Sequence, residues 1–362
     1  MTTHPQGRSH EAESNRARLE RTVAGEIVEQ PVFAVYDWFV RNRPIDWERL
    51  FRLGLGQINH ADLVQHRRPH LEIVETTRQV DGRLRRDVRW ITDVGELHEW
   101  YLSDASPAHF LQEWRQEYLI KTPHDYRIMQ RAWEDTIITA SDEAFEASER
   151  QVGDNGITIG QMDRTPFQKV QIDYAGLERF SYDIADREPA LLELLECLNA
   201  LKLDEFRAIR ASRARHIKLW ENLSIETMGP RLYRQYLVPM YRQIFEILAG
   251  SDQRLQVHYD GQLAVIADDI ADLPFDGLDS LTPPPEGDMT TAQARQRWPD
   301  KFFWLHPSLT WYSLPPEAFA ARLREMVRAA GPRRFCLMIS EEVPPNWEVM
   351  VPLALKTLKH AA

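Results

Sequence analysis

Cysteine and long apolar runs are both scarce in this chain. Only 2 of its 362 residues are cysteines, Cys197 and Cys336, and they lie far apart in the sequence. So few cysteines imply no disulfide framework, and a reducing compartment fits best. The N-terminal segment is polar and charged, and no stretch is apolar enough for a signal peptide or a membrane span. These absences predict a cytoplasmic protein without a membrane anchor.

An excess of positive charge is also missing. The chain has 44 Lys and Arg against 55 Asp and Glu, which gives a formal net charge of -11. A general phosphate-binding surface needs the opposite balance, so nucleic acid is not an expected partner. A local basic run does occur at residues 83–89, but such runs usually form a solvated face. The sequence also lacks a glycine-rich phosphate loop and a dinucleotide fingerprint.

Apolar runs that predict strands alternate with amphipathic segments that predict helices in the second half of the chain. Strands are expected at residues 31–40, 215–224, 254–261, 277–284, 301–308 and 333–342, and helices at 107–150, 183–212, 226–250, 263–274, 315–331 and 346–361. Such alternation means a parallel sheet with helical crossovers, and a series of units favours a barrel.

The first half departs from this alternation. Residues 70–101 alternate apolar and polar side chains on both sides of Asp81-Gly82, which predicts a β-hairpin. We therefore predict an α/β fold, a (β/α)8 barrel with an N-terminal helical and hairpin insertion. Residues 1–18 are expected to form a mobile tail, and residues 19–362 a single barrel domain.

Polar side chains recur where the predicted strands end, and the active site of a (β/α) barrel lies at those ends. The acids there that can do catalytic work are Asp37, Asp260, Glu341 and Glu342. The residues expected to contact a substrate are Trp38, Trp220, Asn222, Tyr259, His306 and Trp311. The aromatic members of this set suit an apolar or aromatic pocket, although core packing is the ordinary role of such rings.

His258 and Asp260 are the strongest pair in this set. Two residues apart on an extended segment, both side chains point to one face. An imidazole and a carboxylate with a third ligand, such as Glu286, suit a divalent metal ion, zinc above all. Alternatively, His258 is a hydrogen-bonded histidine and Asp260 begins a turn with Gly261.

Several segments resemble one known family. "WITDVGELHEWY" (90–101), "LSIETMGPRLYRQYLVPMYRQIFEIL" (223–248), "VHYDG" (257–261), "GLDSLTPPPEGDM" (277–289) and "FCLMISEEVPPNWE" (335–348) resemble, in this order, segments of uroporphyrinogen-decarboxylase-like proteins. The resemblance runs from about residue 20 to the end of the chain and implies a (β/α)8 barrel. It also implies the chemistry of that superfamily, which includes corrinoid-linked methyltransferases.

Two departures narrow what the resemblance implies. The arginine-rich segment of true decarboxylases is replaced by "VYDWFVRNR" (35–43), and the cysteine ligands of the zinc-dependent thiol methyltransferases are replaced by Asp260 and by residues 340–342. The resemblance therefore implies metal-assisted demethylation of a methyl ether, aryl ethers included, or of a similar methyl donor, with transfer to a corrinoid protein partner. Family members often dimerise, which allows a homodimer here. A carboxy-lyase that uses Arg89 or Arg164, and a non-catalytic binding barrel, stay open as alternatives.

Overall fold

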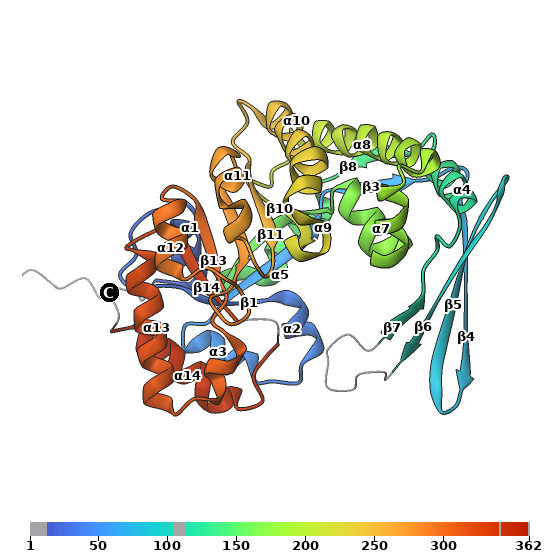
Figure 1. The fold of residues 1–362 in the computed structure, drawn as a ribbon. Coiled ribbons are helices and arrows are strands. Elements are labelled where there is room, and N and C mark those ends of the chain that lie inside the picture. The colour runs from blue at the N-terminus through green and yellow to red at the C-terminus, as the bar shows by residue number, and fades with distance from the viewer. Residues whose placement is uncertain (1–12, 104–112, 340–341, 361–362) are drawn as a thin grey trace, which may run out of the picture.

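The computed structural model describes residues 13–103, 113–339 and 342–360. Eight parallel strands close into a barrel in the order β1-β14-β13-β12-β11-β10-β9-β2, which is chain order around the ring (Figure 1). These strands are β1 Phe33–Tyr36, β2 Gly56–Asp62, β9 Gly156–Asp163, β10 His216–Leu223, β11 Arg254–Tyr259, β12 Gly277–Leu281, β13 Phe302–Leu305 and β14 Phe335–Met338. The predicted (β/α)8 barrel is confirmed.

Helices separate most of the barrel strands and cover the outside of the barrel. They are α1 Asn15–Val23, α2 Asp37–Asn42, α3 Trp47–Arg52, α6 Pro166–Lys169, α7 Leu177–Ala185, α8 Pro189–Ile209, α9 Ile225–Leu232, α10 Val238–Leu248, α11 Ala267–Asp272, α12 Thr291–Arg297, α13 Pro316–Ala330 and α14 Trp347–Leu358. The helix expected at 226–250 is interrupted at Gly229, whose φ of 72° is non-helical, and Pro230 follows it. None of the helices within the described ranges is long and apolar enough to cross a membrane.

The predicted insertion lies between β2 and β9. Strands β4 Glu72–Val80, β5 Arg83–Thr92, β6 Gly95–Ser103 and β7 Glu113–Glu117 form an antiparallel sheet beside the barrel (Figure 1). The hairpin turn falls at Asp81-Gly82, as predicted, and both residues have positive φ, 50° and 78°. Such a two-residue turn matches the twist of the strands that it joins.

Residues 107–150 were expected to be helical, and this is only partly correct. Helices α4 Pro123–Trp133 and α5 Glu143–Val152 lie there, but so do β7 and β8 Ile137–Ala140. β7 pairs with β6, and β8 pairs with β3 Val64–Arg67. These two segments form strands because they pair with strands that are distant in sequence. Such pairing leaves no mark in the local periodicity of apolar residues. Residues 107–112 lie outside the described residues.

The N-terminal helix begins earlier than the predicted domain. Ser14 accepts a hydrogen bond from the Ala17 amide and caps α1, so residues 15–18 are helical, where a tail was expected. Arg18 of this helix is buried and donates to the Gly54 carbonyl at 2.8 Å. The barrel and α1 therefore pack together. Both cysteines are free, as expected.

The N-terminus of α4 carries a testable capping contact. Asp125 accepts hydrogen bonds from the backbone amides of Lys121 and Thr122, each at 2.8 Å. These amides have no partner inside the helix, so we expect Asp125→Ala to lower the free energy of unfolding by about 1 kcal/mol. Urea titration measures it. The exposed Glu196, inside α8 and away from its ends, is the control, and its alanine variant should change stability by less than about 0.5 kcal/mol. Equal effects would contradict the capping role.

Candidate active site

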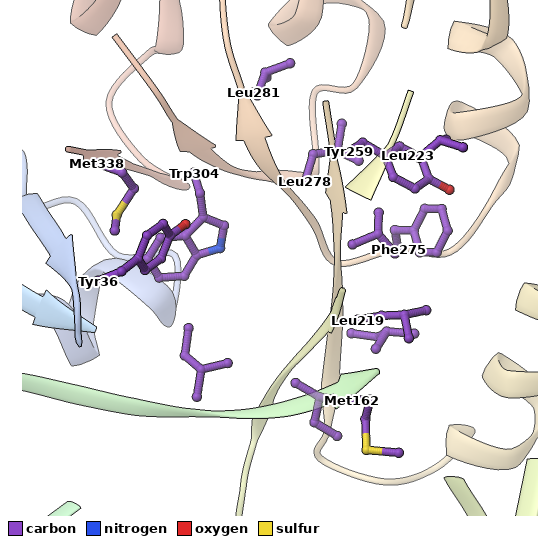
Figure 2. Packing of buried hydrophobic residues seen from close by; sticks show 14 of the residues in the cluster. Tyr36, Met162, Leu219, Leu223, Tyr259, Phe275, Leu278, Leu281, Trp304 and Met338 are labelled. Atoms are coloured by element: carbon purple, nitrogen blue, oxygen red, sulfur yellow. The ribbon is translucent and has the colours of Figure 1, made fainter. Parts of the chain in front are cut away.

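The carboxyl ends of the barrel strands bring together a polar cluster, most of whose members are buried. Its members come from six strands or the residues just after them and are Tyr36, Asp37, His60, Lys218, Trp220, His258, Asp260, Asp279 and His306. Below them Trp304 donates to the Gln256 side chain inside the barrel. Figure 2 labels Tyr36, Trp304 and Met338 among the buried residues of this interior. A (β/α) barrel does its chemistry at this end, so the cluster is the candidate active site.

Asp279 lies at the centre of the cluster and has no exposed surface. Its carboxylate accepts from the Tyr36 hydroxyl, and it lies 2.9 Å from Lys218 Nζ and 2.5 Å from His258 Nδ1. Burial by itself raises the pKa of Asp279, but Lys218 and His258 outweigh it and hold the pKa well below the ordinary value. Asp279 is therefore an ionised carboxylate in the barrel interior.

Lys218 is the cation that faces this carboxylate. It is fully buried, and its Nζ lies 4.1 Å from the ring centre of Tyr36 and 4.5 Å from that of Trp220. Burial lowers the pKa of Lys218, and Asp279 acts in the opposite direction. The aromatic faces add a cation–π attraction to the ion pair. Lys218 is therefore a buried cation that pairs with Asp279 inside the site.

His258 connects the buried carboxylate to the mouth of the barrel. Its Nδ1 contacts Asp279, and its Nε2 lies 3.3 Å from Asp260 Oδ1, a looser ion pair. Burial lowers the pKa of His258, but Asp260 and Asp279 outweigh burial and raise the pKa to about 10. The ring is therefore an imidazolium at neutral pH. The side chain of Asp260 is 33% exposed, so the Nε2 proton lies next to solvent.

Two of the predicted acids belong to this cluster, and a third has partners outside it. Asp37 accepts from His60 Nδ1 at 2.9 Å and from Arg41 at 2.6 Å, and Asp260 pairs with His258. Glu342 instead pairs with Arg43 and accepts from the Val343 amide at 2.8 Å. Glu341 and Ser340 lie outside the described residues, so Glu341 stays a prediction.

The predicted substrate residues divide into two groups. Trp38, Trp220 and His306 lie at the mouth, where Trp38 and Trp220 pack against each other with ring centres 5.6 Å apart. His306 Nε2 lies 3.4 Å from the Tyr36 hydroxyl. Asn222 is exposed at the edge of β10, and Trp311 is half-buried in the short helical segment Leu309–Ser313.

The prediction that Tyr259 contacts a substrate does not fit its position. Tyr259 is fully buried, and its hydroxyl lies 3.1 Å from that of Tyr233. Figure 2 shows it beside Leu223 and Phe275, away from Tyr36 and Trp304. Successive side chains of a strand point to opposite faces. Because His258 points into the barrel, Tyr259 must point outward into the layer of helices.

The structure does not gather the three predicted metal ligands, His258, Asp260 and Glu286, into one group. His258 Nε2 lies 3.3 Å from Asp260 Oδ1, but Glu286 has other partners. Glu286 accepts from the Ser308 hydroxyl at 2.8 Å and from the Leu309 amide at 3.1 Å. Across the described residues, no group of three or more His, Cys, Asp or Glu is placed to hold a metal ion. The divalent metal, zinc included, stays a prediction.

Sequence reasoning missed Lys218, Asp279, Tyr36 and His60. Lys218 and Asp279 each interrupt an apolar strand, "IKLW" and "LDSL", and an isolated charge inside such a run is the signal that could have found them. Charged residues are almost never fully buried unless they are paired. Once the strands are known to form one barrel, a charged residue inside an apolar strand therefore predicts an oppositely charged partner in another strand.

A cavity lies at the opposite end of the barrel. It has a volume of about 700 Å³ and is lined by residues of α1, α5 and the starts of β9 and β10. Arg16 and Glu149 on its wall pair with each other, as do Arg213 and Glu146. None of the cluster residues lines this cavity. The active sites of (β/α) barrels lie at the carboxyl ends of the strands, where the cluster is.

Glu221 shows how an acid at a strand end can have a structural role. It is buried outside the barrel and accepts from Thr165 Oγ1 and the Tyr241 hydroxyl, each at 3.0 Å. Burial raises the pKa of Glu221 to about 7, against the opposing effect of these hydrogen bonds. A carboxyl group with a raised pKa in the folded state stabilises the fold most below its unfolded pKa, and this stabilisation is lost as the pH rises through about 7.

We therefore expect Glu221→Gln to remove part of the pH dependence of stability. Relative to the unchanged protein, the variant should gain up to about 3 kcal/mol in unfolding free energy between pH 5 and pH 8. Urea unfolding at the two pH values measures this. The same stability difference at both values would show that the carboxyl group is not protonated in the fold.

The sequence matches no protein-family model and no curated protein. Among solved structures, the fold is similar to a methyltransferase from Methanosarcina mazei, with 17% identity and a TM-score of 0.47 over 60% of this chain and 62% of that one. It is also similar to a putative vitamin-B12-independent methionine synthase from Listeria monocytogenes, with 16% identity and a TM-score of 0.39 over 60% of this chain and 66% of that one. The chain thus spans less than two thirds of the length of either protein. A B12-independent methionine synthase from Shewanella sp. W3-18-1 matches at 10% identity and a TM-score of 0.40 over 80% and 76% of the two chains.

Proposed function

We propose that this protein is a methyltransferase that demethylates a methyl ether, foremost an aryl ether, and passes the methyl group to a corrinoid on a partner protein. The observation that carries the proposal is His258, an imidazolium between Asp279 and Asp260 beside the Trp220 ring, whose centre is 4.9 Å away. The motif resemblance to the uroporphyrinogen-decarboxylase-like superfamily supports methyl transfer as the reaction.

The chemistry needs a proton at one defined place. The carbon–oxygen bond of the methyl ether breaks, and its electron pair stays on the oxygen. His258 Nε2 donates its proton to that oxygen, so the product is an alcohol or a phenol and not an anion. When bound, the Co(I) corrinoid supplies the electron pair that takes the methyl group. Asp260, at the solvent side, then stabilises the return of a proton to His258 from water.

Aromatic side chains provide a surface for the rest of the substrate. Trp38 and Trp220 are half-buried at the mouth, and Trp38 stacks on Tyr36 with ring centres 4.3 Å apart. A substrate ring that packs against these tryptophans gains both apolar burial and ring–ring attraction. The arrangement therefore favours an aryl ether over a short aliphatic one.

A carboxy-lyase receives less support from the same residues. Such an enzyme needs a free cation for the substrate carboxylate, but Arg89 pairs with Glu96 on the inserted sheet at 3.4 Å. Arg164 pairs with Asp173 at 3.2 Å, and Lys218 is held by Asp279. The cations considered for this role are therefore already neutralised by carboxylates of the chain.

The test is methyl transfer from a panel of methyl ethers to free Co(I) cobalamin, followed by the absorbance of the methylated product and by the released phenol. We expect turnover with aryl methyl ethers. Release of carbon dioxide from carboxylated substrates, or ligand binding with no turnover, would contradict the proposal and favour a lyase or a binding barrel. So would about one equivalent of tightly bound zinc that is lost in His258→Ala, because a metal-bound His258 has no proton to donate at its ligating nitrogen.

A further inference from the structure

His60, at the carboxyl end of β2, is a second histidine of the site whose proton position is fixed. Its Nδ1 lies 2.9 Å from Asp37 Oδ1, and Arg41 Nη1 donates to Asp37 Oδ2 at 2.6 Å. Burial raises the pKa of Asp37, but His60 and Arg41 outweigh burial and lower it. Asp37 is thus an ionised carboxylate, which only accepts hydrogen bonds. His60 Nδ1 must therefore be the donor.

The other ring nitrogen of His60 has no such partner. Burial, with the nearby Lys218, lowers the pKa of His60 to about 4, so the ring is neutral and its one proton is on Nδ1. Nε2 is buried and, within the described part of the chain, makes no hydrogen bond. A buried acceptor without a partner costs stability, so its retention calls for an explanation.

The surroundings of Nε2 belong to the mouth of the site. The His60 ring centre lies 5.3 Å from Tyr36, 5.1 Å from Trp38 and 5.2 Å from Trp220. Trp220 also contacts His258, at 4.9 Å. His60 and His258 therefore flank the Trp220 ring. His60 offers a lone pair at Nε2, and His258 offers a proton. Trp38 and Trp220 are both half-buried, so a ligand that displaces either ring reaches His60.

We propose that His60 Nε2 accepts a hydrogen bond from a hydroxyl group of the substrate. The substrate is then a methyl ether that also carries a free hydroxyl, such as a phenol with a neighbouring methoxy group. This inference rests on the proposed function. Asp37, expected from the sequence to be catalytic, becomes a positioning residue because it fixes which nitrogen of His60 holds the proton.

The test compares the binding of 2-methoxyphenol and 1,2-dimethoxybenzene, which differ by one methyl group on the hydroxyl. Quenching of tryptophan fluorescence reports the affinity without any methyl transfer. We expect the protein to bind 2-methoxyphenol about tenfold more tightly, because only this ligand donates a hydrogen bond. His60→Leu should reduce the preference to less than about twofold, mainly through weaker binding of 2-methoxyphenol.

Asp37→Asn gives a result that a structural role does not predict. Arg41 will hold the amide oxygen, which turns the amide nitrogen toward His60 Nδ1 and moves the ring proton to Nε2. His60 then donates, and the preference should disappear or reverse in favour of 1,2-dimethoxybenzene. Merely loosened packing would weaken both ligands alike. Circular dichroism checks the fold, and His60→Gln, with a milder loss of preference, replaces His60→Leu if that variant unfolds.

Equal affinity of the unchanged protein for the two ligands, or no binding of either, overturns the inference. The readout also separates it from the proposed function. A preference for 2-methoxyphenol without methyl transfer from any ether would leave hydroxyl recognition in place and overturn the methyltransferase. Methyl transfer together with equal affinities for the two ligands would support the methyltransferase and overturn hydroxyl recognition.

Discussion

His258→Gln is expected to lower methyl transfer from methoxybenzene by about 10²- to 10⁴-fold, the usual contribution of a positioned general acid. Glutamine keeps a similar size and one amide donor, but it cannot give up a proton. The phenolate oxygen would then have to leave as an anion in a site that already holds Asp260 and Asp279. The rate of phenol release under saturating ether and Co(I) cobalamin measures the effect.

The leaving group separates acid catalysis from a loss of structure. A methyl ether of a nitrophenol needs little help from a proton, so its rate should fall far less in His258→Gln than the rate with methoxybenzene. His70→Gln is the matched control, because His70 also pairs with a carboxylate, that of Asp135 at 3.0 Å, on the inserted segment. An equal loss with both ethers would contradict the role of His258 as an acid.

The pH profile follows from the charge on His258. The two carboxylates raise its pKa to about 10 against the effect of burial, so the imidazolium persists below that pH and is lost above it. Transfer from methoxybenzene should therefore be level across neutral pH and fall as the pH rises through about 10. The rate measured between pH 6 and pH 11 checks this. A fall centred near pH 6.5, the value of an ordinary histidine, would place the ring outside the influence of Asp260 and Asp279.

The sequence predicts six of the barrel strands but not β2 and β9, and the reason lies in their side chains. In β2, the buried Gln57 donates to Asn59 at 2.7 Å. These polar residues interrupt the apolar run by which a buried strand is predicted. In β9, a Cβ atom at Gly156 would lie 1.7 Å from the Gln57 carbonyl oxygen. Glycine there permits a close approach of two backbones, and it leaves no side chain to give a pattern.

The candidate site is predictable to the extent that its members are neighbours in sequence. His258 and Asp260 share one strand end, and the structure brings them within 3.3 Å, as the spacing indicates. Lys218 and Asp279 are 61 residues apart by their numbers, and only the closure of the barrel shows that each neutralises the other. Their roles depend on tertiary pairing, which a pattern along the chain does not contain.

Asp279→Asn is expected to cause the largest loss of stability, about 3–5 kcal/mol in the free energy of unfolding. Asparagine keeps the shape and can still bond to Tyr36, but it leaves the fully buried Lys218 without an anion. Adding Lys218→Met should recover most of the loss, because the double variant buries no unpaired charge. Urea unfolding of the single and double variants measures both effects. A double variant no more stable than Asp279→Asn would mean that the pair is not the source of the loss.

The pH dependence of the same variant identifies the buried ammonium as the cause. Burial already lowers the pKa of Lys218 in the fold, and removing Asp279, which opposes this, lowers it further. The unfolded chain, with a lysine pKa near its ordinary value of about 10.4, then binds more protons than the folded chain. Stability of Asp279→Asn must therefore rise with pH between the folded and unfolded pKa values of Lys218. We expect its deficit against the unchanged protein to be larger at pH 6 than at pH 9, and this difference to shrink when Lys218→Met is added. The part that remains belongs to His258, whose raised pKa also depends on Asp279. A deficit that does not change with pH would assign the loss to the hydrogen bonds of Asp279 with Tyr36 and His258.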